Sequence, residues 1–110
     1  MAKMDCWIIR RATDGEKETD HVIGYHYEGR VSSSIQEVIP EKRQVKTRSG
    51  RIYDLSSAPR TNNDAEYVWS QWASINGVIS FKDVTEEYLS KFKEAVDAAS
   101  AQQTTTEAQG

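Results

Sequence analysis

The stretch that decides the fold is NDAEYVWSQWASING, residues 63–77. Its apolar side chains recur at intervals of three and four, which is the spacing of one face of an amphipathic helix. Asn63 is a suitable N-cap, with a glutamate three positions later, and Gly77 follows an asparagine as a typical left-handed stop. The pattern predicts a central helix over about 64–76 whose two tryptophans cover one side of a sheet.

The sixty residues before this helix carry the marks of β structure. Val, Ile, Tyr and Thr are frequent there, and Gly and Pro separate the runs. Gly24 would mark a bulge, and Glu28–Arg30 reads as a turn. The clearest hairpin closes through a two-residue turn at Ser49-Gly50. The sequence predicts an antiparallel meander of about five strands within residues 5–56, with strands over 5–12, 21–27, 31–39, 43–48 and 51–55.

After the central helix the chain changes again. A short extended piece over 78–81 leads to a second periodic stretch, capped by Asp83 or Thr85, which predicts a C-terminal helix over about 84–99. Residues 100–110 have no apolar period, and we expect them to form a disordered polar tail. Strands followed by helices are typical of a single α+β domain, here over residues 1–99.

The composition narrows the class of protein. The 110 residues have a formal net charge of −3 and a mean hydropathy of −0.71. Residues 1–60 carry eleven basic and nine acidic side chains, whereas residues 61–110 carry three and eight. A single cysteine excludes a disulfide framework and a cysteine-rich zinc site. Without a long apolar run or a signal-peptide core, we expect a cytoplasmic protein with no membrane partner.

The residues that commonly carry chemistry are scattered. His21 and His26 lie five apart, on opposite faces of one strand, and are expected to be ordinary exposed or half-buried residues. Cys6 is expected to be a buried structural thiol. The glycines occur singly, so no phosphate-cradling loop is present. The sequence therefore predicts no catalytic residue, metal or cofactor, and a protein that is not an enzyme. A small nuclease or hydrolase using one of the histidines is the least favoured hypothesis.

One cluster of charged residues stands out from the rest of the sequence, a basic hairpin over residues 42–51. Lysine and arginine on a ribbon follow a phosphate backbone, and they also bind carboxylates on another protein. The alternative is that these charges protect an edge strand from aggregation. An exposed tyrosine would add a stacking or anchoring group. The candidate partner-binding residues are Lys46, Arg48, Arg51, Tyr53 and Tyr67.

No family motif is present in the sequence. Its brevity, its lack of catalytic motifs and its polar tail resemble those of accessory proteins from phages and mobile elements, a likeness of type that assigns no residue a role. We expect a small non-enzymatic interaction module that binds a partner protein or itself. The alternative is an accessory protein that binds nucleic acid through the basic hairpin 42–51.

Overall fold

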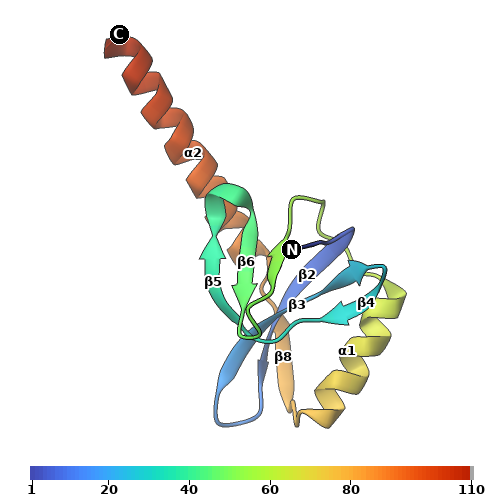
Figure 1. Cartoon of the computed structure of the whole chain (residues 1–110). Helices are drawn as coiled ribbons and strands as arrows, with labels where there is room; N and C mark the ends of the chain where they lie inside the picture. Colours follow the sequence, from blue (N-terminus) through green and yellow to red (C-terminus); the bar gives the residue numbers. More distant parts are fainter. Residues whose placement is uncertain (110) are drawn as a thin grey trace.

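The computed structural model describes the backbone of residues 1–109 and the side chains of residues 1–99. Within these residues two four-stranded sheets pack with two helices, so the predicted α+β class is confirmed (Figure 1). The first sheet has the strand order β1-β7-β6-β5, and the second has the order β4-β3-β2-β8. The elements are β1 Ala2–Lys3, β2 Cys6–Thr13, β3 Glu18–His26, β4 Glu28–Val31, β5 Ile35–Ile39, the short 3-10 helix Pro40–Lys42, β6 Gln44–Thr47, β7 Ile52–Asp54, α1 Asn63–Ile75, β8 Ser80–Asp83 and α2 Thr85–Gln109.

The meander divides between the two sheets. Strands β2, β3 and β4 pair in sequence order in the second sheet, and β5, β6 and β7 do so in the first. Two short strands complete the sheets: β1, which the sequence did not mark, runs parallel to β7, and β8, which overlaps the extended piece predicted over 78–81, pairs antiparallel with β2. The expected turn at Glu28–Arg30 is instead part of β4, because the chain reverses at Tyr27, which has a φ of 65°.

Strand β2 lies at the centre of the protein and is buried on both faces. Trp7 and Ile9 point toward the first sheet and α2, whereas Ile8 and Ala12 point toward α1. A strand covered on both faces reads as a continuous apolar run rather than an alternation, which explains the sequence of β2. Cys6 in this strand is buried, as predicted. Helix α1 therefore covers the face of the second sheet that is turned away from the first sheet (Figure 1).

Helix α1 begins one residue earlier than predicted. Its N-cap is Asn62, in extended conformation, whose side-chain oxygen accepts a hydrogen bond from Ala65 N at 3.0 Å. The expected cap, Asn63, is the first helical residue. Trp69 is buried, as predicted, and Trp72 is half-buried and stacks on it with ring centroids 5.4 Å apart.

Gly24 does not mark a bulge. The pairing of β3 with β2 is unbroken from Cys6–Tyr25 to Thr13–Glu18. A Cβ atom at Gly24 would lie 2.3 Å from the carbonyl oxygen of Cys6, so a close backbone approach explains the glycine.

Helix α2 starts on the body and then leaves it. Asp83, the last residue of β8, accepts a hydrogen bond from the first helical amide, Thr85 N, at 2.8 Å, and Tyr88 and Phe92 pack into the core. Beyond these residues the helix projects away from both sheets (Figure 1). The backbone of α2 is helical to Gln109, ten residues beyond the predicted end of the helix near 99. The side chains of residues 100–110 lie outside the described residues, and the disordered polar tail stays a prediction. Within the described residues, no helix combines the length and the apolar character needed to cross a bilayer.

Candidate functional site

The hairpin of β6 and β7 carries the basic residues that the sequence singled out. Lys46 pairs with Ile52, and Thr47 N donates to Arg51 O at 3.0 Å, so the loop holds three residues and not the two predicted. Gly50 takes a φ of 89° in the loop and donates to Thr47 O at 2.8 Å. A three-residue loop with glycine in this conformation is a standard hairpin closure. Relative to a two-residue turn, Arg48 moves from the strand into the loop.

Three of the five candidate residues lie together at this end of the hairpin, which we call the basic tip. Lys46, Arg48 and Arg51 are all exposed. None of the three forms an ion pair with another of the described side chains. Strand β6 is hydrogen-bonded on both sides, to β5 and β7, so edge protection does not explain Lys46.

The other two candidates are not part of the basic tip. Tyr53 is only 5% exposed and packs in the core beside Val45 and Leu55, so it offers no stacking surface. The alternation of β7 explains this correction, because Tyr53 pairs with the buried Val45. Tyr67 is 64% exposed, as predicted, and its hydroxyl accepts a hydrogen bond from Gln71. It lies on α1, across the second sheet from the hairpin.

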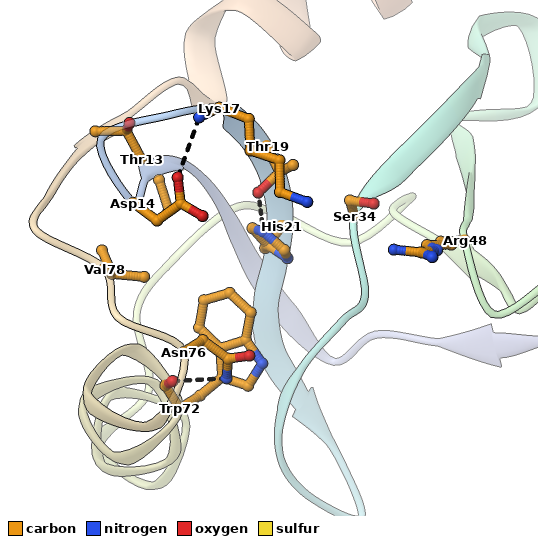
Figure 2. Close-up of a pocket in the computed structure, with 11 residues that line it drawn as sticks. Thr13, Asp14, Lys17, Thr19, His21, Ser34, Arg48, Trp72, Asn76 and Val78 are labelled. Atoms are coloured by element: carbon orange, nitrogen blue, oxygen red, sulfur yellow. Dashed lines mark hydrogen bonds between the residues drawn. The ribbon is translucent and has the colours of Figure 1, made fainter.

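A pocket of about 290 Å³ adjoins the basic tip and includes Arg48 (Figure 2). We call it the Lys17 pocket, because Lys17 supplies its second cation. Neither cation is in an ion pair with a described side chain. Its walls come from the end of β2, the β2–β3 turn and β3, from the segment before β5, from the β6–β7 loop, and from the end of α1 with the residues that follow it. The lining residues are Ala12, Thr13, Asp14, Lys17, Thr19, His21, Ser34, Arg48, Trp72, Asn76 and Val78.

Two hydroxyl groups in the pocket are free to donate a hydrogen bond. Thr13 Oγ1 accepts a hydrogen bond from Gly15 N at 3.0 Å, and Ser34 Oγ accepts one from Gln36 Nε2 at 3.0 Å, so each hydroxyl proton is available. Asp14 Oδ1 accepts hydrogen bonds from the backbone amides of Glu16 and Lys17. These amides hold the pKa of Asp14 below its usual value, so the pocket contains one carboxylate beside its two cations.

His21 forms the floor of the pocket and is 4% exposed. Its Nδ1–H donates to the carbonyl of Ser32 at 2.9 Å, so its Nε2 accepts from the Thr19 hydroxyl at 2.7 Å. Its ring centroid lies 4.5 Å from that of Trp72. Burial lowers the pKa of His21, and the Ser32 carbonyl and Asp20 oppose this effect only in part. The imidazole is therefore neutral near pH 7.

The sequence placed His21 at the surface or half-buried, and the structure corrects this. The signal was present, because His21 shares its parity along β3 with Ile23, a buried residue. His26 is half-buried, as predicted, and its Nδ1 lies 2.7 Å from Lys3 O. The sequence did not single out Lys17 as a site residue, because it lies within a run of charged residues that is typical of a solvent-exposed turn. Only the fold brings it to the same pocket as Arg48.

The pocket contains two of the groups found in a nucleophilic catalytic site, a hydroxyl and a histidine. A hydroxyl bonded to a histidine nitrogen is the arrangement found in serine hydrolases. Here, however, the other ring nitrogen bonds a backbone carbonyl and not a carboxylate, and Asp20 is engaged by Arg11 at 2.8 Å. Among the described residues, no group of three or more His, Cys, Asp or Glu side chains is placed to hold a metal ion.

No protein-family model matches this sequence, and no curated protein or solved structure is significantly similar to it.

Proposed function

We propose that the protein is a small non-enzymatic interaction module whose basic tip binds an acidic segment of a protein partner. The observation that carries the proposal is the exposure of Lys46, Arg48 and Arg51 at one end of a hairpin without ion pairs among the described side chains. Arginine binds carboxylates through two parallel hydrogen bonds, which gives such a surface geometric selectivity.

Two observations favour a protein over nucleic acid as the partner. Non-specific binding of single strands combines cations with exposed aromatic side chains, and Tyr53, the aromatic residue next to the tip in sequence, is buried. The chain is also acidic overall, with a net charge of −3, and eight of its acidic residues follow position 60. This acidic part would repel a long polyanion that extends along the molecule more than a short acidic segment held at the tip alone. Nucleic-acid binding by the same tip remains the alternative.

The test compares two labelled probes of similar length and charge, a glutamate-rich peptide and a single-stranded DNA. We expect the peptide to bind more tightly than the DNA at physiological salt. The double reversal Arg48→Glu and Arg51→Glu should weaken peptide binding roughly tenfold or more, because each reversal replaces an attraction by a repulsion. The thermal midpoint should change little, because both side chains are exposed.

A matched control carries the reversals Lys91→Glu and Lys93→Glu on the exposed side of α2. It has the same net charge as the tip variant, so a purely global charge effect would weaken both equally. Equal loss in the two variants, or unaltered peptide binding in the tip variant, would contradict the proposal. Tighter binding to DNA, with affinity falling steeply as salt rises, would establish the alternative instead.

We also propose that the protein acts in the cytoplasm and serves as an accessory protein of the kind found in phages and mobile elements. Binding of a second copy of the chain is a further form of the same interaction, and a light-scattering mass across a range of concentrations distinguishes it from binding to another protein.

A further inference from the structure

The Lys17 pocket brings together two cations that come from different parts of the fold. Lys17 belongs to the β2–β3 turn and Arg48 to the β6–β7 loop, yet both line the same pocket. In Figure 2 their charged ends point toward Ser34 from opposite sides of the view. Neither cation forms an ion pair with a described side chain, so an anion bound in the pocket would be attracted by both.

Hydroxyl donors complete the set. Thr13 and Ser34 each accept a hydrogen bond from another group and retain a proton to donate. With Lys17 and Arg48 they supply donors from three separate walls of the pocket. A planar carboxylate is satisfied by the fork of one arginine, whereas a tetrahedral group presents oxygens in several directions. The distribution of donors matches the tetrahedral group better.

The remaining groups of the pocket set the charge balance and the shape. Asp14 is the one acidic side chain in the lining, and it opposes the two cations. His21 is neutral at the floor, where the Thr19 hydroxyl holds it. Trp72 and Val78 form an apolar wall, and the volume of about 290 Å³ exceeds what a single phosphoryl group needs. The extra space and the apolar wall fit a short carbon stem.

We propose that the Lys17 pocket binds a phosphoryl group carried on a side chain of the protein partner. This inference rests on the proposed function, because Arg48 belongs both to the basic tip and to the pocket. It adds the chemistry of the bound group: the acidic segment of the partner also carries a phosphoryl group, which the pocket binds while Lys46 and Arg51 bind the neighbouring acidic residues. Free inorganic phosphate carries the same chemistry and serves as the minimal probe.

The experiment is a titration followed by amide and indole NMR resonances of the full chain. Inorganic phosphate, acetate, a phosphoserine peptide and the matching serine peptide are the four probes. We expect saturable shifts at Thr13, Lys17 and the Trp72 indole with phosphate, stronger binding of the phosphopeptide than of free phosphate, and no more than weak binding of acetate. Shifts that are absent, or equal affinities for acetate and phosphate, would overturn the assignment.

Three variants separate this proposal from the one on which it rests. Lys17→Gln should weaken phosphate binding several-fold, and Asp14→Asn should strengthen it while keeping the side-chain oxygen that accepts the turn amides. Lys46→Gln, outside the pocket, should leave phosphate binding unchanged and weaken binding of the glutamate-rich peptide. If Lys46→Gln and the arginine reversals leave peptide binding intact, the proposed function fails. If Lys17→Gln and Asp14→Asn leave phosphate binding intact, the pocket assignment fails by itself.

Discussion

Asp20 is the residue through which β3 holds helix α2. Arg11 binds its two carboxylate oxygens at 2.8 and 3.1 Å, and the Tyr88 hydroxyl donates to it at 2.6 Å. Arg11 continues to Glu87 of α2 at 2.8 Å. Burial raises the pKa of Asp20, but the hydrogen bonds from Arg11 and Tyr88 outweigh burial and lower it. The carboxylate is therefore charged throughout the physiological range and ties the first turn of α2 to β3.

Replacing Tyr88 by phenylalanine tests this link. The change removes the hydroxyl donor and keeps the ring in the core, so the free energy of unfolding should fall by about 1.5–3 kcal/mol, the range typical of a hydrogen bond to a charged group. Urea unfolding measures it. The control is Tyr67→Phe, which removes an exposed hydroxyl bonded to Gln71 and should cost much less. Equal losses for the two variants would show that Asp20 does not anchor the helix.

The buried His21 makes stability depend on pH in a defined direction. Burial lowers its pKa in the folded protein below the ordinary 6.5, so the unfolded chain binds a proton first as the pH falls. Its contribution to stability is complete above pH 6.5 and is lost as the pH falls from 6.5 toward the lowered value. Between about pH 7.5 and about pH 5.5, the free energy of unfolding measured in urea should therefore fall less for His21→Gln than for the wild type. An identical slope in both proteins would contradict this account.

At the scale of elements, the start of α1 separates two neighbouring asparagines. Asn62→Ala removes the side-chain acceptor of the Ala65 amide and should cost about 1 kcal/mol of stability, whereas Asn63→Ala should be close to neutral. Thermal or urea unfolding of the two variants decides the matter. A larger loss of stability for Asn63→Ala than for Asn62→Ala would show that Asn63 is the N-cap, as the sequence pattern predicted.

The helices and strands themselves were largely predictable from the sequence, but the pairing of distant strands was not. The apolar period of 63–77 and the alternation of 43–55 located α1 and the β6–β7 hairpin, because both patterns are local. The cap and the loop length each differed by one residue, since consecutive asparagines, or adjacent turn residues, offer nearly equal alternatives. The parallel pairing of Ala2 with Tyr53 joins segments fifty residues apart, and no local pattern encodes it.

At the scale of the whole molecule, the candidate site was only partly predictable. Composition and spacing identified Lys46, Arg48 and Arg51, because charges on a hairpin stand out in a linear sequence. The Lys17 pocket could not be found in this way, since its walls come from four separate stretches of the chain, 12–21, 34, 48 and 72–78. The burial of Tyr53 follows from the alternation of side chains along β7, but only once its pairing with the buried Val45 is known.

The most direct test of the central claim maps the binding surface itself. A glutamate-rich peptide is titrated into the isotopically labelled full chain, and the amide shifts are followed residue by residue. The account predicts that the largest shifts fall at residues 46–51 and that Tyr67 and the exposed side of α2 stay unaffected. Saturable shifts centred elsewhere, with residues 46–51 unchanged, would contradict it.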